Sequence, residues 1–200
     1  MVNINVKGNL LKKVPPGVCK LKMLEVLDIS DNQLKALPKT VHKAAALHTF
    51  VASGNKVRKL PPKIGDSKTL RYVRVQNNLL KTLPKTIYKI PVEVDASNNL
   101  IKELPKIALT KKVKDVHLNK LFLSKNQLQT LPEGFEFLQC MTHLDISHNQ
   151  FQELPASVGH LRFLEFLDIS HNDIGIIHED FCKLSEFMNQ VKRKNQISVS

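Results

Sequence analysis

The sequence has 200 residues, of which 42% are hydrophobic and 24% are charged, and this size and balance suit one soluble globular domain. Trp is absent and Tyr occurs twice, so an aliphatic core is expected. No apolar run approaches the roughly 18 residues that a membrane-spanning helix needs, which excludes integral membrane contact.

The formal charge of +12 is unevenly distributed along the chain. Residues 1–114 contain 23 Lys and Arg against 7 Asp and Glu, whereas residues 115–200 contain 7 against 11. A basic N-terminal half suggests an anionic surface or partner there. The alternative is that the lysines keep an elongated surface soluble.

The three cysteines, Cys19, Cys140 and Cys182, are odd in number and far apart in sequence. A secreted disulfide framework normally has an even, clustered set. No basic and apolar leader follows Met1. We therefore expect a reduced, cytoplasmic location, in which the cysteines are buried small hydrophobic residues.

A short phrase of the form LxLxxNxLxxLP, in which L is any aliphatic residue, recurs along the chain. Its central residue is an asparagine in each copy: Asn9, Asn32, Asn55, Asn78, Asn99, Asn126, Asn149 and Asn172. The steps between successive copies are 23, 23, 23, 21, 27, 23 and 23 residues. A period of this length is the signature of a solenoid built from stacked coils.

Each copy predicts the same two elements. The alternating apolar pair before the Asn, such as Leu27 and Ile29, predicts a short strand with one buried face, which must pair in parallel with the next coil. The Asn is expected to be buried and to satisfy backbone groups at the turn that follows. An apolar residue three positions after the proline, such as Val41 or Ile87, marks a short helical segment, whose first turn suits proline.

This repeat resembles that of the leucine-rich repeat family, and its 23-residue LPxxI form is similar to the intracellular Ras-associated scaffold proteins of that family. The resemblance covers residues 2 to about 180. It implies an α/β leucine-rich repeat solenoid of about eight coils over residues 1–180, with a curved parallel β-sheet on the concave face and short helical or 3-10 segments on the convex face. It also implies a non-enzymatic scaffold that binds a small GTPase, a phosphatase subunit or another signalling protein. A solenoid hosts many roles, so the partner is not identified by the fold.

Two coils depart from the period. The step from Asn78 to Asn99 is two residues short of 23, and the step from Asn99 to Asn126 is four residues long. The long step predicts a loop or helix that bulges from the convex side near residues 108–115. Such an insertion is either a tolerated surface feature or part of a binding face.

The two ends of the solenoid also differ from each other. Apolar residues at spacings of three and four predict an amphipathic capping helix over residues 181–194, followed by a tail at 195–200. No comparable lid precedes the first strand, which is expected from about Ile4. We therefore expect a monomer unless this edge pairs with another chain.

Strand positions between the buried ones face the concave surface. The residues four before each Asn form a central column: Asn5, Asp28, Val51, Arg74, Asp95, Phe122, Asp145 and Asp168. The residues six before form a neighbouring column, which includes Val26, Thr49, Tyr72, Lys120, His143 and Phe166.

Exposed aromatic and Arg side chains are favoured anchors of protein interfaces. We therefore predict that the partner binds the following residues of these columns: Val51, Tyr72, Arg74, Asp95, Phe122, Asp145, Phe166 and Asp168. The alternative is that these side chains only support one another across the strands, with Arg74 paired to Asp95.

A basic ladder lies three residues after successive asparagines and consists of Lys12, Lys35, Arg58, Lys81 and Lys102. Stacked like charges repel, and an acidic protein surface or anionic lipid headgroups would relieve that repulsion. These residues are therefore candidate anion-binding groups, and peripheral contact with an anionic membrane is the rival function. A solvated face is the simpler alternative. Nucleic acid is not expected, because aromatic interleaving and a recognised motif are lacking.

The sequence predicts no enzyme, cofactor or metal site. It contains no GxxxxGK[ST], GxGxxG, GxSxG or HExxH motif. Adjacent coils superimpose several groups that ligate metals: His143, His148, His171, Asp145 and Asp168. They point from different positions of an open sheet, so we predict no metal there. A third hypothesis makes this chain the recognition segment of a larger enzyme or receptor.

Overall fold

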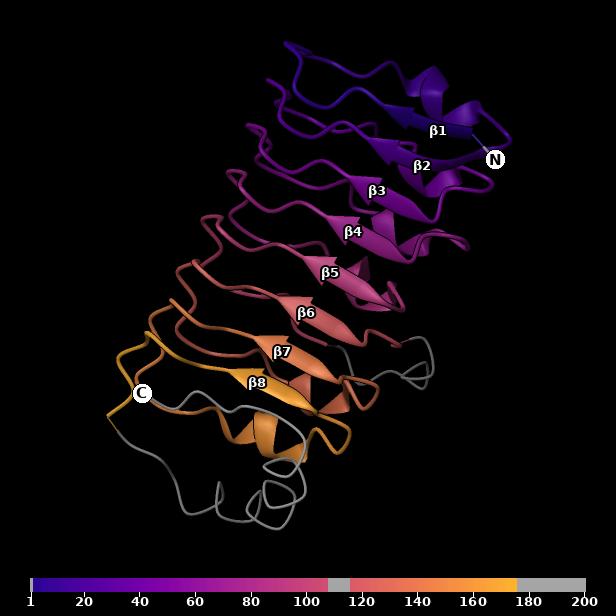
Figure 1. Ribbon diagram of the computed structural model, residues 1–200. Coiled ribbons are helices and arrows are strands. Elements are labelled where there is room, and N and C mark those ends of the chain that lie inside the picture. Colours follow the sequence, from indigo (N-terminus) through magenta and orange to yellow (C-terminus); the bar gives the residue numbers. More distant parts are fainter. Residues whose placement is uncertain (1, 108–115, 176–200) are drawn as a thin grey trace.

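The computed structural model describes residues 2–107 and 116–175, and these residues form a stack of coils that runs the length of the molecule (Figure 1). Each coil contributes one strand to a parallel, eight-stranded sheet whose spatial order follows the sequence order. The strands are β1 (Val2–Asn5), β2 (Leu24–Asp28), β3 (Thr49–Val51), β4 (Tyr72–Arg74), β5 (Glu93–Asp95), β6 (Lys120–Phe122), β7 (His143–Asp145) and β8 (Phe166–Asp168). The predicted solenoid is confirmed, and its first strand begins slightly before Ile4.

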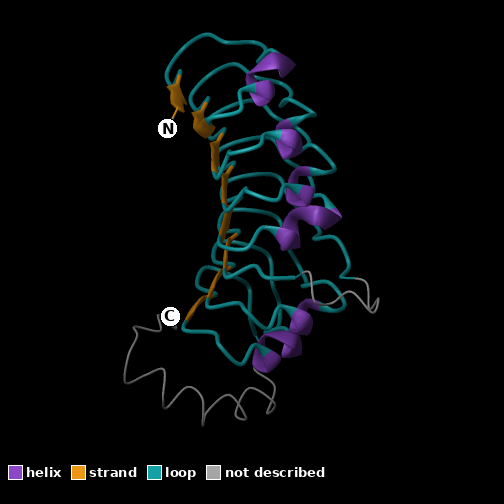
Figure 2. Ribbon diagram, turned by 90° about the vertical axis from the view of Figure 1, so that its right-hand side faces the viewer, coloured by secondary structure: helices purple, strands orange, loops and turns teal. Residues whose placement is uncertain are grey.

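Short 3-10 helices return the chain on the side opposite the sheet, so the strands line the concave side and the helices the convex side (Figure 2). They are η1 (Pro16–Lys20), η2 (Val41–Lys43), η3 (Ile64–Asp66), η4 (Lys85–Lys89), η6 (Phe135–Phe137) and η7 (Ala156–His160). None exceeds five residues. A segment this short forms too few hydrogen bonds to offset the entropic cost of nucleating an α-helix. It can still close the tighter i to i+3 bonds of a 3-10 helix.

The LPxxI spacing has a direct hydrogen-bonding cause. The carbonyl of the proline accepts the backbone N–H of the apolar residue three positions later, as from Val41 to Pro38 at 3.2 Å and from Ile87 to Pro84 at 2.9 Å. That apolar side chain is fully buried at both positions. The proline therefore starts the turn, and the residue three positions later ties it to the core.

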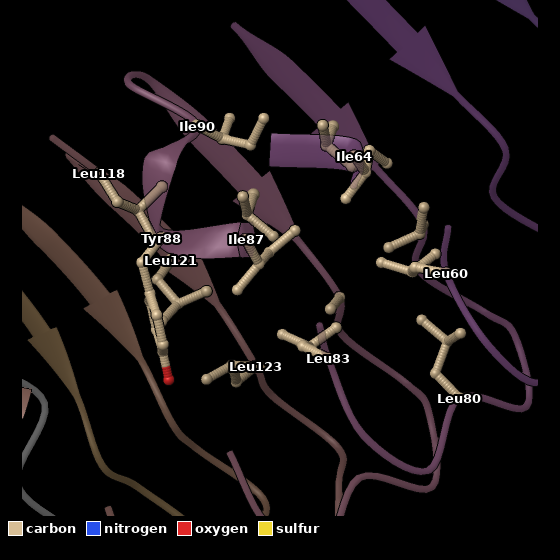
Figure 3. Close-up of a cluster of buried hydrophobic side chains, with 14 of the residues drawn as sticks. Leu60, Ile64, Leu80, Leu83, Ile87, Tyr88, Ile90, Leu118, Leu121 and Leu123 are labelled. Atoms are coloured by element: carbon tan, nitrogen blue, oxygen red, sulfur yellow. The ribbon is translucent and has the colours of Figure 1, made fainter. Parts of the chain in front are cut away.

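The core between the two layers is mostly aliphatic (Figure 3), but Phe50, Phe135 and Phe151 are fully buried in it and Tyr88 is buried as well, so the expectation of an aliphatic core holds only in part. Tyr88 is buried among leucines and isoleucines, and its hydroxyl donates to the carbonyl oxygen of Pro105 at 3.0 Å. Burial raises the pKa of this phenol. Tyr88 lies in the short coil between Asn78 and Asn99, and its side chain reaches across to the next coil.

An asparagine ladder runs along the turns that follow the strands and confirms the predicted role for seven of the eight asparagines, whereas Asn9 is exposed, so the expectation of burial is wrong there. Asn78 is typical: its Oδ1 accepts the N–H of Val57 in the preceding coil at 3.0 Å, and its Nδ2 donates to the carbonyls of Ala52, Val75 and Gln76 at 3.0, 3.1 and 3.2 Å. The members are Asn32, Asn55, Asn78, Asn99, Asn126, Asn149 and Asn172. One side chain thus satisfies backbone groups of two coils, which locks each coil to the one before it.

Three sequence predictions fall on residues outside the described part: the bulge at 108–115, the capping helix at 181–194 and the tail at 195–200. For the cysteines, Cys19 is buried but Cys140 is exposed, so the expectation of burial is wrong for Cys140, and Cys182 lies outside the described residues. Cys140 precedes Met141 and β7 in a loop, whereas Cys19 lies within η1 and faces the core. Within residues 2–107 and 116–175, no helix is long and apolar enough to cross a membrane.

Candidate functional site

The concave face is built from the predicted columns, because the strand register places equivalent residues side by side. The register of the central column runs from Asp28 through Val51, Arg74, Asp95, Phe122 and Asp145 to Asp168. Neighbouring members are separated by the spacing of paired strands, about 4.8 Å. All predicted partner-binding residues therefore lie on one continuous surface.

The neighbouring column contains an acidic residue that the sequence reasoning missed. Glu93 lies between Tyr72 and Lys120 in register. Its Oε1 accepts a hydrogen bond from Arg74 Nε at 2.8 Å, and this bond raises the pKa of the Arg74 guanidinium. The alternative hypothesis paired Arg74 with Asp95, but the ion pair is made with Glu93, and Asp95 adds only a smaller electrostatic attraction. The signal was present, since Glu93 occupies the position six before Asn99.

The carboxylates of the central column have a structural bond as well as an exposed side. Oδ1 of Asp145 accepts the backbone N–H of Ser147 at 3.0 Å and its hydroxyl at 2.7 Å. Asp95 and Asp168 accept the backbone N–H two residues later in the same way, at 3.0 and 2.9 Å. This Asx turn ends the strand and fixes the direction of each carboxylate on the concave face.

An aromatic and acidic cluster occupies the C-terminal half of the concave face. In the central column, Phe122 lies between the carboxylates of Asp95 and Asp145, and all three side chains are half-buried. In the neighbouring column, the ring of His143 stacks on the ring of Phe166, with centroids 5.9 Å apart. The cluster combines apolar anchors with negative charge, which is the chemistry of a surface that accepts basic and apolar groups.

His143 is the titratable group of this cluster whose pKa the surroundings shift. Its pKa is lowered, first by burial and second by the positive charge of Lys120, while Glu165 opposes the shift. Lys120 is its direct neighbour on β6. The imidazole is therefore biased towards its neutral form, in which it packs against Phe166.

The three histidines of the metal hypothesis belong to two different columns. His148 and His171 stack on each other with centroids 4.0 Å apart and planes 12° apart, whereas His143 stacks on Phe166. Within the described residues, no group of three or more His, Cys, Asp or Glu could hold a metal ion.

The stacked histidines belong to a left-handed column that the sequence reasoning did not identify. The residue before each Asn has a positive φ: Gly8, Asp31, Gly54, Asn77, Asn98, Lys125, His148 and His171. Gly, Asn and Asp dominate the first five coils of this column, and that composition was an available signal.

The basic ladder lies away from the concave face. Its five members, Lys12, Lys35, Arg58, Lys81 and Lys102, are all exposed. They follow the turn, so they lie on the flank between the strands and the convex 3-10 helices. The structure thus separates the two sets of predicted site residues onto two surfaces.

In the comparison with protein families, residues 116–174 match the family model described as Leucine rich repeat. Comparison with curated proteins gives no match.

Comparison with solved structures matches the fold over most of the chain. A leucine-rich repeat protein of Leptospira interrogans has a TM-score of 0.79 and 27% identity, covering 90% of this chain and 45% of that chain. A plant peptide hormone receptor, RGFR1 in complex with RGF2, has a TM-score of 0.70 and 23% identity, covering 90% and 29%. A chain of the octameric complex of Latrophilin 3, Unc5D and the leucine-rich repeats of FLRT2 has a TM-score of 0.73 and 19% identity, covering 92% and 64%. The chain spans less than two thirds of the length of each of these structures.

Proposed function

We propose that this chain, a leucine-rich repeat solenoid, is a protein-binding module that takes up its partner on the concave face. The observation that carries the proposal is the half-buried Phe122, which lies between two oriented carboxylates in the C-terminal half of the open sheet. Aromatic side chains in such positions are typical anchors of protein interfaces. Two of the similar structures are themselves complexes, the plant receptor with RGF2 and FLRT2 with Latrophilin 3 and Unc5D.

The chemistry of the concave face describes the partner. The carboxylates of Asp95, Asp145 and Asp168 surround or follow Phe122 in the central column. Arg74 is engaged by Glu93, so the free charge of this face is negative towards its C-terminal half. The partner surface should therefore be apolar with basic residues beside it.

The partner class rests on the repeat pattern. The LPxxI repeat resembles that of Ras-associated scaffold proteins, which supports a small GTPase, a phosphatase subunit or another signalling protein as partner. On this proposal the chain works as a non-enzymatic scaffold in signal transduction.

A matched pair of double variants tests the concave face. Arg74→Ala with Phe122→Ala removes one Arg and one Phe from the central column, and Arg162→Ala with Phe163→Ala removes the same residue types from the exposed loop after η7. We expect affinity capture from cell extract to lose partners with the first variant and to keep them with the second. Adding Tyr72→Ala to the first variant should deepen the loss.

Quantitative binding of each captured partner should agree. The concave double variant should weaken binding by about 10-fold or more, as anchor truncations do. Retention of the same partners with the same affinities by both double variants would contradict the concave-face proposal.

A further inference from the structure

The basic ladder is held rigidly at coil spacing. From the second coil on, the residue directly after the Asn donates its N–H to a carbonyl of the preceding coil, as from Lys56 to Leu34 at 2.9 Å and from Leu79 to Val57 at 2.9 Å. The ladder residue lies two positions further along this paired backbone. Successive cations therefore branch from anchors about 5 Å apart, the spacing of hydrogen-bonded strands.

The ladder charges have no anionic partner in the part of the chain that the structure describes. The ion pairs there join Lys7 to Asp31, His48 to Glu25, Arg74 to Glu93, Lys89 to Asp66 and Lys106 to Glu133. None of these pairs includes a ladder residue. Unrelieved repulsion between neighbouring cations favours an external anion.

More cations lie between the ladder and the convex 3-10 helices of the first five coils, up to Lys85 at the start of η4, and one of them, Lys106, is paired with Glu133. They lie four to eight residues after each Asn: Lys13, Lys39, Lys59, Lys63, Lys85 and Lys106. In the next coils the ladder position changes to Gln129 and Gln152. The basic band therefore has a definite end within the solenoid.

The shape of the flank suits a planar partner. The curvature of the solenoid runs between the strands and the 3-10 helices (Figure 2), whereas the turn ends of the coils line up along one edge (Figure 1). A flat surface can therefore meet all five ladder residues at once. The curved concave face cannot be matched by a plane in this way.

The residue types of the band separate a lipid surface from other polyanions. Four of the five ladder residues are Lys, a residue depleted from protein interfaces. None is aromatic, and single-stranded nucleic acid normally requires aromatic stacking platforms. The band thus has the composition of a polybasic lipid-binding segment, whose Lys and Arg interact with anionic headgroups as charges.

Exposed leucines accompany the cations. Leu10, Leu79 and Leu100 follow their asparagines directly and are 77%, 36% and 37% exposed. The buried residue that comes next places the leucine and the ladder cation on the same outward side, because side chains alternate along extended backbone. Basic and apolar residues on one face are typical of proteins that bind the membrane interface.

We propose that the basic ladder docks the solenoid, flank first, on a membrane surface rich in anionic lipid. Phosphate and carboxylate headgroups neutralise the stacked cations, and the leucines enter the interface. In this orientation the concave face stays open to solution, so the partner and the membrane occupy separate surfaces.

A charge-matched pair of triple variants tests the ladder by co-sedimentation with vesicles. Lys35→Glu with Arg58→Glu and Lys81→Glu reverses the ladder, and Lys20→Glu with Lys43→Glu and Lys68→Glu makes the same change in net charge at exposed sites at or after 3-10 helices. The full-length wild type should bind vesicles of phosphatidylcholine with phosphatidylserine and ignore phosphatidylcholine alone. The ladder variant should bind at least about 100-fold more weakly, because each cation near the surface contributes about a factor of five to ten. The control variant should retain most of the binding.

Other outcomes would overturn the proposal. Equal loss in both triple variants would mean that net charge alone drives adsorption. Absence of wild-type binding to the phosphatidylserine vesicles would remove the membrane as partner. Ladder-dependent binding to polyglutamate or to single-stranded RNA that exceeds binding to the vesicles would assign the ladder to a soluble polyanion.

A single tryptophan reports the orientation directly, because the chain contains none. Leu79→Trp places the probe on the basic flank, and Phe163→Trp places it at a 65% exposed site outside the flank. The emission of Leu79→Trp should shift to the blue with phosphatidylserine vesicles and return in 1 M salt, where the screening length falls to about 3 Å. A shift in Phe163→Trp without one in Leu79→Trp would refute flank-first docking. Neither readout depends on the concave residues, so this proposal can fail while partner binding survives.

Discussion

The asparagine ladder and the central column of the concave face run through the same coils, yet their residues behave in opposite ways. At each rung of the ladder the same side chain makes the same bonds, with Oδ1 on the preceding coil and Nδ2 on nearby carbonyls. Along the central column Val51, Arg74, Asp95 and Phe122 succeed one another with no shared chemistry. A position repeats where its surroundings repeat, and it is free to vary where its neighbour is solvent or a partner.

The largest expected effect on stability comes from removing one side chain of the asparagine ladder. Asn78→Ala leaves the N–H of Val57 without its acceptor and removes one of two donors from three carbonyls. The carbonyls of Ala52, Val75 and Gln76 keep Asn55, Asn99 and the N–H of Gly54 as donors. The unsatisfied buried N–H costs about 1–3 kcal/mol and the lost bonds to the carbonyls add to it, so the free energy of unfolding should fall by roughly 3 kcal/mol. Urea unfolding followed by circular dichroism measures the change.

The chain supplies its own control for this substitution. Asn9 occupies the same repeat position but is exposed, and its Nδ2 contacts only the carbonyls of Val6 and Lys7. Asn9→Ala should cost well under about 1 kcal/mol. Similar losses for Asn9→Ala and Asn78→Ala would show that burial and inter-coil bonding do not distinguish the ladder.

The next effect concerns how closely two coils approach on the convex side. A Cβ on Gly65 would lie 1.6 Å from the carbonyl oxygen of Thr86, whereas a Cβ on Gly17 in η1 would meet nothing within 4 Å. Gly65→Ala should therefore lower the free energy of unfolding by about 1–3 kcal/mol through overpacking. Gly17→Ala should be neutral or slightly stabilising. Thermal unfolding of the two variants decides the matter, and a neutral Gly65→Ala would mean that the coils can separate without loss.

These contrasts explain which features could be predicted from the sequence. The asparagine spacing gave the strands, their register and the turn bonds, because each depends on contacts that recur in every coil. The partner of Arg74 could not be read from the register, because a long side chain can reach the diagonal Glu93 instead of the facing Asp95. The repeat pattern did not predict the hydrogen bond from the backbone N–H of Ser147 to Asp145, because this bond is local and joins a concave-face side chain to the backbone two residues later.

The Arg74–Glu93 ion pair on the concave face should contribute little to stability, in contrast to the asparagine ladder. The side chains are 44% and 17% exposed, so solvent screens their attraction. A double-mutant cycle of Arg74→Ala and Glu93→Ala should give a coupling energy of about 0.2–1 kcal/mol in urea unfolding. The same two single variants should change partner binding unequally, because only Arg74 is strongly exposed. A coupling energy as large as the loss expected for Asn78→Ala would show that this ion pair stabilises the fold as strongly as the asparagine ladder does.

The smallest expected effect is electrostatic. It tests whether charges in the neighbouring column of the concave face can change without disturbing the asparagine ladder. The pKa of His143 is lowered, mainly by burial and then by Lys120, so an NMR titration should give a midpoint below the ordinary value of about 6.5. Lys120→Ala should raise that midpoint and Glu165→Gln should lower it further. Because the folded protein holds this proton less tightly than the unfolded chain, the contribution of His143 to stability is present above about pH 6.5 and is lost as the pH falls towards the folded pKa. The loss should be a few tenths of a kcal/mol, because the ring remains partly open to solvent, and His143→Ala should remove it.

Amide exchange at Leu128, whose N–H donates to Asn149 of the asparagine ladder, should stay unchanged in Lys120→Ala if the concave-face columns and the asparagine ladder are independent. Faster exchange at that amide would show that the displayed columns also hold the coils together.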